Sequence, residues 1–281
     1  MVKGNTLIIA TLAAASATGG ARAADLLPPP PPIEAPPPAE FGGWYLRGDA
    51  GVGAVQISGW KSTLQPYDEL GNPLAGTLVV PAYDAIGDQA FAGAGFGYQF
   101  NNWLRGDLTA EYRTEANYRA GLLAAIPGSD WYPGFLGADY YTAGVSSLVV
   151  LANGYIDLGH WCGVTPFVGA GVGFVNHKFA GLTDSGLGFG TAADKYTTNF
   201  AWSVTAGVGL SVTPNLKLEV AYRYLDMGNI GSNPIQCLNP QGCFQERHSF
   251  YLASNDIRVG FRYLLGGPPP PPALPPVVAK Y

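Results

Sequence analysis

Charged residues are scarce in this sequence. Its 15 Lys and Arg and 20 Asp and Glu make up 12% of 281 residues, against roughly 25% in soluble domains. A formal net charge of −5 argues against a nucleic-acid partner, because such partners are bound through clusters of cations. The 39 Gly and 24 Pro argue against a helix-rich enzyme, since both disfavour helix interiors. Yet 47% of the residues are apolar, too many for a disordered chain.

Long apolar runs are missing beyond the N-terminus. Lys3, the apolar residues 7–18 and the sequence Ala21-Arg22-Ala23 have the pattern of a secretory signal peptide covering residues 1–23. This run is shorter than the roughly 20 residues of a membrane-spanning helix, and no later window is long and apolar enough for one. We therefore expect an exported protein that is either soluble or a membrane β-barrel.

Proline is concentrated in two tracts, residues 28–38 and 268–276. Such tracts form extended polyproline II spacers. They predict a Pro-rich periplasmic segment at residues 24–41, a folded unit at 42–265 and a Pro-rich C-terminal tail at 266–281.

Period-two alternation predicts eight β-strands in the folded unit. In each segment one set of alternate residues carries no charge, as in Trp44, Leu46 and Gly48, which indicates a strand with one apolar face. The segments are residues 44–54, 90–100, 104–113, 148–157, 167–174, 202–212, 216–224 and 256–263.

The connections between these segments alternate in length. Three are short turns, and short turns on one side with long loops on the other are typical of outer-membrane barrels. The predicted fold is all-β: an eight-stranded antiparallel transmembrane β-barrel with short periplasmic turns and long extracellular loops. The predicted long loops are residues 58–88, 114–144, 176–198 and 225–253.

The second face of the predicted strands carries seven cations and six anions. In a membrane barrel this face lines the lumen, which side chains just fill when there are eight strands. Because a buried unpaired charge is costly, the near balance predicts a salt-bridged plug that excludes sugar-sized solutes; a small-solute, porin-like channel is the alternative. The predicted lumen charge network is Arg47, Asp49, Arg105, Asp107, Glu111, Arg113, Asp157, Lys217, Glu219, Arg223, Asp256, Arg258 and Arg262.

Aromatic residues gather near both ends of the predicted strands. Tyr and Trp are enriched at the two interfaces of a membrane, where the ring is apolar and its tip stays wet. The positions are Trp44, Phe100, Trp103, Trp161 and Tyr263 on the short-turn side, and Tyr112, Phe174, Trp202, Tyr222 and Tyr224 toward the long loops.

Four segments resemble the small outer-membrane β-barrel surface proteins of alphaproteobacteria, an OmpA-like group of the porin family. The resemblance implies a barrel in the cell outer membrane with structural and surface-antigen roles and, in some members, hemin binding. The last strand also resembles the signal read by the barrel-assembly machinery, through Arg258, Gly260, Tyr263 and Leu265. The four segments are residues 44–49 (WYLRGD), 151–159 (LANGYIDLG), 165–173 (TPFVGAGVG) and 213–224 (TPNLKLEVAYRY).

Few residues suggest further chemistry. Cys237 and Cys243 lie six apart in one predicted loop, and export favours a disulfide between them; Cys162 lies in a turn on the opposite side. Glu246, His248 and Ser249 could supply a base and a nucleophile for a lipid-A-modifying enzyme. However, His248 and Ser249 point opposite ways on an extended chain, so polar loop residues are the favoured interpretation.

The remaining expectations concern ligands and partners. We expect no cofactor, no metal and no catalytic site; hemin binding would rest on the resemblance and on the loop aromatics Trp131, Tyr132, Tyr140 and Tyr141. Expected partners are outer-membrane lipids, lipopolysaccharide and the barrel-assembly machinery, with contact to the cell wall or a periplasmic partner through the Pro-rich tails. The loops carry an acidic excess that could bind divalent cations, but solvated loops are favoured.

Overall fold

The structure is a computed structural model that describes residues 42–64, 76–126, 134–186, 188–238 and 246–266. The chain divides into a unit of Met1–Pro37, which lies outside the described residues, and a unit of Pro38–Tyr281, which holds every described strand. The predicted signal peptide and both Pro-rich tracts also fall outside the described residues.

Among the described residues there is no helix long and apolar enough to cross a membrane.

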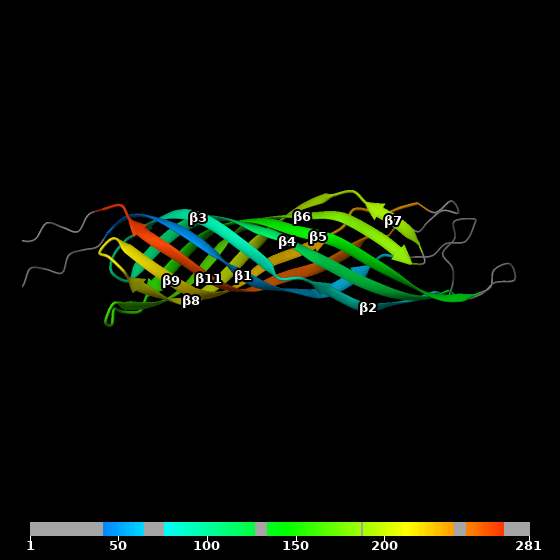
Figure 1. Ribbon diagram of the computed structural model, residues 1–281, viewed down its shortest axis with the longest axis horizontal. Helices are drawn as coiled ribbons and strands as arrows, with labels where there is room; N and C mark the ends of the chain where they lie inside the picture. The colour runs from blue at the N-terminus through cyan, green and yellow to red at the C-terminus, as the bar shows by residue number, and fades with distance from the viewer. Residues whose placement is uncertain (1–41, 65–75, 127–133, 187, 239–245, 267–281) are drawn as a thin grey trace, which may run out of the picture. The chain divides into compact units, whose positions relative to one another are not determined.

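The described residues form one antiparallel sheet of eleven strands (Figure 1). The strands are β1 (Gly43–Ser62), β2 (Leu78–Ile86), β3 (Gln89–Gln99), β4 (Leu104–Ile126), β5 (Phe135–Asp157), β6 (Val164–Gly186), β7 (Phe189–Ala192), β8 (Lys195–Ser211), β9 (Leu216–Gly231), β10 (Gln236–Cys237) and β11 (His248–Leu264).

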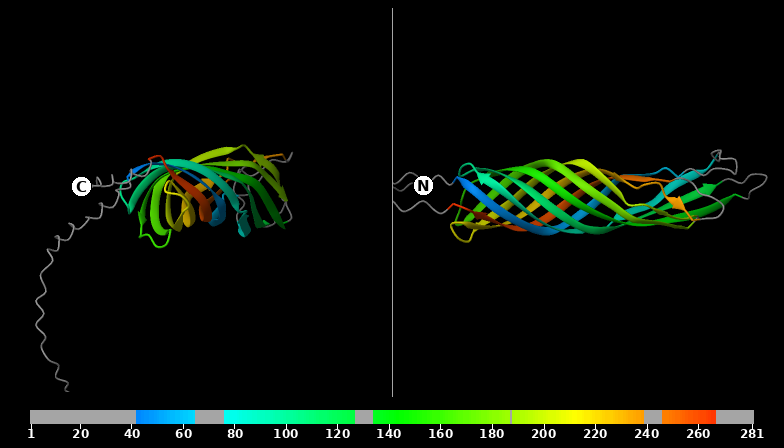
Figure 2. Two further views of the ribbon diagram at one scale, coloured as in Figure 1. Left: turned by 60° about the vertical axis from the view of Figure 1, so that its left-hand side comes forward. Right: turned by 90° about the horizontal axis from the view of Figure 1, so that it is seen from above.

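Eight of these strands close into a ring, and Figure 2 shows the resulting barrel obliquely and from above. The order around the ring is β1, β3, β4, β5, β6, β8, β9 and β11, and β11 pairs back to β1 with Leu264 opposite Tyr45. The short strands β2, β7 and β10 pair with β4, β6 and β7 at one end of the ring. The predicted eight-stranded antiparallel barrel is confirmed. Each predicted segment coincides with part of one ring strand, although Phe100 and Val212 fall just outside β3 and β8.

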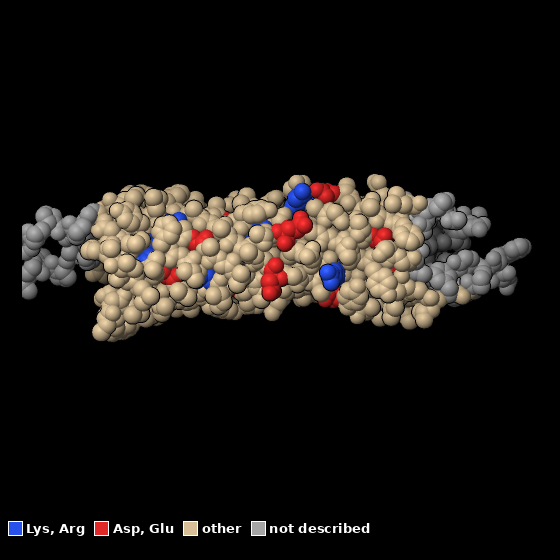
Figure 3. Space-filling view, viewed as in Figure 1, with Lys and Arg blue, Asp and Glu red and all other residues tan. Residues whose placement is uncertain are grey.

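Side chains alternate between lumen and exterior as the pattern predicts. In β1, Tyr45 is 0% exposed and its neighbour Trp44 is 57% exposed. The exterior of the ring is apolar between a lower level marked by Trp44, Trp103 and Tyr263 and an upper level marked by Tyr112, Phe174, Trp202 and Tyr222. We call this zone the apolar band. On the face seen in Figure 3, the larger groups of charged atoms lie midway along the barrel.

The residue ranges predicted for the long loops are wrong, because the strands continue beyond the band. β4 and β5 are 23 residues each, whereas a tilted strand crosses a membrane in about 9–11 residues. They remain paired from Ala116 opposite Val145 to Ile126 opposite Phe135, within the predicted loop 114–144. We call the described parts of the ring strands beyond Tyr112, Phe174, Trp202 and Tyr222, together with β2, β7 and β10, the distal extension.

The interior changes character at the start of the distal extension. Within the band the lumen holds charged side chains, whereas the distal extension encloses a mainly apolar core. The change coincides with irregular pairing between Arg113 and Ala116 and between Thr142 and Gly144, where a bulge shifts the alternation of a strand. The distal core includes Tyr118, Leu122, Tyr141, Val145, Phe179 and Phe250.

Candidate functional site

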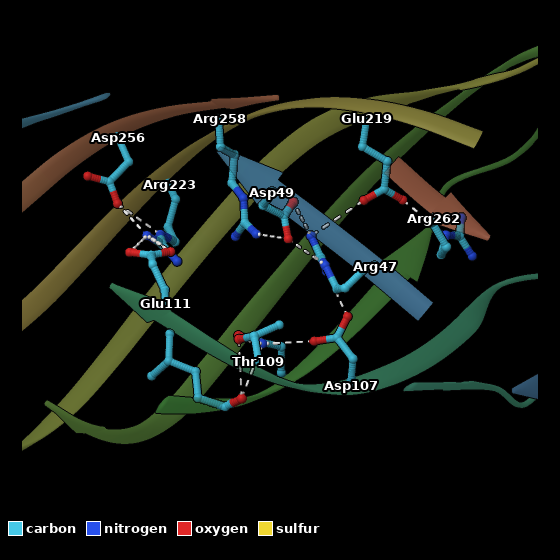
Figure 4. A network of polar contacts seen from close by, with 12 residues as sticks. Arg47, Asp49, Asp107, Thr109, Glu111, Glu219, Arg223, Asp256, Arg258 and Arg262 are labelled. Carbon is cyan, nitrogen blue, oxygen red and sulfur yellow. Dashed lines mark hydrogen bonds and ion pairs between the residues drawn. The ribbon is translucent and has the colours of Figure 1, made fainter. Parts of the chain in front are cut away.

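The proximal charge layer is centred on Arg47 of β1. Its Nε lies 2.8 Å from Asp49 Oδ2, its Nη1 lies 2.7 Å from Asp107 Oδ2, and its Nη2 lies 3.6 Å from Glu219 Oε2. Asp49 also pairs with Arg258, at 2.7 Å from Nη2. These groups come from β1, β4, β9 and β11, so the layer ties opposite walls of the ring together (Figure 4).

A second group of the same layer surrounds Glu219. Its Oε1 lies 3.1 Å from Arg262 Nε and 3.3 Å from Arg105 Nη2, and Arg105 Nε lies 3.1 Å from Asp157 Oδ1. The Arg105 guanidinium also stands 4.2 Å from the centre of the Tyr155 ring, where the negative face of the ring attracts a cation.

The distal charge layer contains two arginines and two carboxylates. Arg113 Nη2 lies 2.7 Å from Asp256 Oδ1, and Arg113 Nη1 lies 3.0 Å from Glu111 Oε1. Arg223 Nη2 reaches the same two carboxylates at 2.6 and 2.8 Å. Both guanidinium groups face the ring of Phe91. Each carboxylate therefore has two cationic partners.

The structure brings together twelve of the thirteen residues of the predicted network. Six arginines and six carboxylates form ion pairs with one another, and each of these side chains is at most 6% exposed. The thirteenth residue, Lys217, is half-buried and forms no ion pair with the described residues. The paired set is neutral, which is what burial in a narrow lumen requires.

A polar cluster lies inside the distal extension. Glu246 Oε1 lies 2.9 Å from His248 Nε2, and Glu246 Oε2 accepts a 2.7 Å hydrogen bond from the Tyr141 hydroxyl. Tyr118 Oη lies 3.1 Å from His248 Nδ1 and accepts a hydrogen bond from Trp60 Nε1. We call Trp60, Ser62, Tyr118, Tyr141, Glu246 and His248 the mouth cluster.

Three of these residues, Trp60, Ser62 and Tyr118, were missed from the sequence because they fall within predicted loops. Tyr141 was named only as a loop aromatic. Alternate apolar residues at Tyr118, Ala120 and Leu122 were a usable signal, since all three face the distal core. The charged residues Glu115 and Arg119 on the intervening positions obscured that signal, because they removed the charge-free phase expected of a lipid-facing strand.

An acidic side chain close to the mouth cluster has a perturbed pKa. Burial raises the pKa of Asp184 to about 7, and the carboxylates of Asp139 and Glu246 contribute. Burial and Glu246 also raise the pKa of the Tyr141 hydroxyl. Tyr141 therefore stays protonated and can donate to Glu246 at any physiological pH.

The Asp184→Asn variant is expected to be more stable than the parent at pH 8, with a difference that disappears near pH 4. The folded-state pKa of Asp184 is raised above its unfolded value, so the parent loses stability as the pH rises from about 4 to 7. The gain is about 1 kcal/mol after solvent screening of a half-buried group. The temperature at which the heat-modifiable gel band is lost, measured at both pH values, checks this. An equal difference at both would contradict it.

Glu246, His248 and Ser249, the residues considered for catalysis, do not assemble into one group. Glu246 lies just before β11 and His248 is its first residue. Both are polar residues, as expected, but they are buried, at 2% and 1% exposed. Ser249 faces the exterior, as the alternation predicts, and does not meet His248. His177 is buried and contacts Ser147 and the carbonyl of Met227. Within the described ranges no group of three or more His, Cys, Asp or Glu could hold a metal ion.

The remaining predicted residues are separated or undescribed. Tyr140 is 52% exposed on the exterior whereas Tyr141 is buried in the interior, so the two do not face one ligand; Trp131 and Tyr132 lie outside the described residues. Cys243 does too, and although Cys237 belongs to β10 its side chain is not described. The predicted disulfide therefore stays a prediction. Cys162 is free and exposed.

Comparison with known proteins gives a consistent set of similarities. A family model described as outer membrane protein beta-barrel domain matches residues 10–243. An uncharacterized protein of Brucella abortus (strain 2308) is 31% identical over 193 residues, covering 65% of this chain and 67% of that protein. A protein named as an adhesin in Rickettsia typhi is 27% identical over 230 residues, covering 78% of this chain and 87% of that protein.

Among solved structures, the outer membrane protein OprG from Pseudomonas aeruginosa matches with a TM-score of 0.50 and 14% identity. The match covers 82% of this chain and 98% of OprG. At that identity the likeness concerns the fold alone.

Proposed function

The chain belongs to the family of outer membrane protein β-barrel domains, and from this premise we propose that it is a closed, non-conducting barrel that acts through its surface. It is a β-barrel protein of the cell outer membrane. Its apolar band faces lipid, and its short turns lie on the periplasmic side, as in other such barrels. The distal extension then stands outside the cell, where a surface-interaction role would be carried.

The proposal that the barrel does not conduct rests on one observation, the pairing of charges across the lumen. Arg47 joins β1 to β4 and β9, and Arg113 joins β4 to β11. These contacts lie across the path that a solute would follow, and the paired side chains are buried. The apolar core of the distal extension lies above them and adds a second obstruction.

Planar-bilayer recording tests this proposal. The full-length protein, inserted from detergent, is expected to give no large stable conductance steps, because both charge layers would have to separate for ions to pass. An Arg47→Ser, Arg262→Ser double variant, which removes two side chains from the proximal layer, should still be silent, since the distal layer remains. Large stable steps from the unaltered protein would overturn the proposal and favour the porin-like channel.

The mouth cluster favours a structural role over catalysis. A nucleophilic triad needs the histidine between the hydroxyl and the carboxylate, so that it can accept the hydroxyl proton. Here Ser62 donates its hydrogen bond to Glu246, and Glu246 lies between Ser62 and His248. The proton of Ser62 is therefore directed to the carboxylate. This arrangement supports a barrel without hydrolytic activity.

The surface role has two supports. The Rickettsia relative is named as an adhesin, and the exterior of the distal extension exposes large apolar side chains such as Tyr83, Leu123 and Tyr140, which are typical of interaction surfaces. Outer-membrane lipids, lipopolysaccharide and the assembly machinery belong to the proposed partners, and the Pro-rich tails to a proposed periplasmic or cell-wall contact. Unchanged pull-downs after deletion of both tails would argue against that contact.

A further inference from the structure

The wall of the barrel has a window where β8 and β9 separate. The two strands pair from Ser211 opposite Lys217 up to Trp202 opposite Asp226. Beyond that point β8 continues along β6, and β9 continues along β11. The facing edges of β8 and β9 therefore have no strand between them in the distal extension, directly beyond the apolar band.

Side chains hold the window at its lower and upper ends. At the lower end the Asn199 amide of β8 donates to the carbonyl oxygens of Met227 and Asn229 of β9. At the upper end the Asn233 amide donates to the carbonyl of Asp194, at 3.1 Å. These side-chain bonds bridge the two strand edges where the ladder of backbone bonds is absent.

A groove of about 340 Å³ lies in this window. Its lining includes two cations, Lys195 and Arg247, and contains no carboxylate. Lys195 Nζ donates to the carbonyl of Ser232, and neither cation forms an ion pair with a carboxylate of the described chain. Asp194, the acidic neighbour of Lys195, is engaged by Lys178 at 3.1 Å. Among the described residues, the two cations of the groove therefore have no acidic partner.

The hydroxyl groups of the groove add to its surplus of donors. Thr63 Oγ1 accepts from the Arg247 amide, and Ser232 Oγ accepts from the His248 amide, each at 2.9 Å. Each hydroxyl thus keeps its own proton for another acceptor. Thr197 Oγ1 is buried and has no hydrogen-bond partner among the described residues, and a buried unsatisfied hydroxyl is costly unless a ligand completes it.

We propose that this window binds a phosphate-bearing saccharide, with Lys195 and Arg247 contacting the phosphate and Thr63, Thr197 and Ser232 donating to phosphate or sugar oxygens. A groove that offers cations and hydrogen-bond donors but no carboxylate selects an anion that is rich in acceptor oxygens. On β8 the lining of the groove begins at Thr197, beyond Trp202 and outside the apolar band. The proposed membrane placement puts it on the extracellular side, where the phosphorylated sugars of lipopolysaccharide stand. The inference rests on the proposed membrane placement and adds a ligand class to the proposed surface role.

Calorimetric titration of the full chain in detergent micelles tests the site with three probes: deacylated lipopolysaccharide oligosaccharide, the same oligosaccharide after phosphatase treatment, and glucosamine 1-phosphate. Saturable binding of the first, and at least tenfold weaker binding of the second, is expected. Comparable binding of glucosamine 1-phosphate would assign the site to free sugar phosphates, and binding of the oligosaccharide alone would assign it to lipopolysaccharide. Equal binding with and without phosphate, or no binding of any probe, would overturn the proposal.

Matched variants locate the binding. Arg247→Gln and Lys195→Met should each weaken binding by roughly tenfold, because each removes one charge-assisted hydrogen bond. Arg119→Gln, which removes an exposed arginine from β4 outside the groove, should leave binding unchanged. Equal effects at positions 119 and 247 would overturn the assignment. Conductance of the same preparation is read separately, so an open lumen would contradict the proposed function without touching the groove.

Discussion

Replacing Arg113 with methionine is expected to destabilise the barrel by about 3–5 kcal/mol, because removing one partner leaves buried charges uncompensated. The Arg113 side chain is fully buried and contacts the carboxylates of Glu111 and Asp256. In the variant Arg223 is the one cation left beside both carboxylates, so a net negative charge remains buried in a space shaped for a neutral group. The measurement is the denaturant concentration at which the heat-modifiable band of the detergent-purified protein disappears.

Lys217→Met is the matched control for this prediction. Lys217 also faces the lumen, but it is half-buried and has no ion pair within the described chain, so its replacement should change stability by less than about 1 kcal/mol. An Arg113→Met, Asp256→Asn double variant restores neutrality and should recover part of the loss. Equal stability of the Arg113→Met and Lys217→Met variants would show that the ion pairs do not stabilise the barrel.

The barrel wall and the lumen residues could be predicted from the sequence because lipid imposes a strict rule. Every outward position within the band is uncharged. One set of alternate positions, such as Trp44 and Leu46, therefore faces lipid, and the other set, such as Arg47 and Asp49, faces the lumen. That rule is local and can be followed residue by residue. The contacts within the lumen could not be predicted, because Arg113 and Asp256 are 143 residues apart and their meeting depends on ring closure and register.

The distal extension was missed because outward positions need to be uncharged only where the strands face lipid. Beyond the band, outward positions such as Glu115 and Lys178 are charged, and the irregular pairing at Arg113 and Ala116 shifts the alternation. The sequence then resembles a polar loop although the backbone stays paired. The window between β8 and β9 could not be predicted for a different reason. Lys195 and Asn229 both fall in predicted loops, and only the strand pairing shows that β8 and β9 separate there.

The Gly97→Val variant is expected to lose the folded barrel, or to retain it with a stability lowered by about 3 kcal/mol, because the lumen has no room at this position. A Cβ atom on Gly97 would lie 2.5 Å from Cζ of Tyr45 and 2.6 Å from Cβ of Asp107, and would also meet the carbonyl of Gly106. The backbone oxygen cannot move without breaking the pairing of β3 and β4.

Displacement of Tyr45 would also disturb the proximal charge layer, because its hydroxyl donates to Asp107, at 3.0 Å, and Asp107 pairs with Arg47. Gly154→Val is the matched control: Gly154 lies on the exterior of β5, and an added Cβ there meets nothing within 4 Å. It should fold and show the heat-modifiable band at the parent's level. If both variants fold equally well, the glycines of the lumen are not required by its narrowness, and the plug must be looser than the distances between Arg47, Asp107 and Glu219 imply.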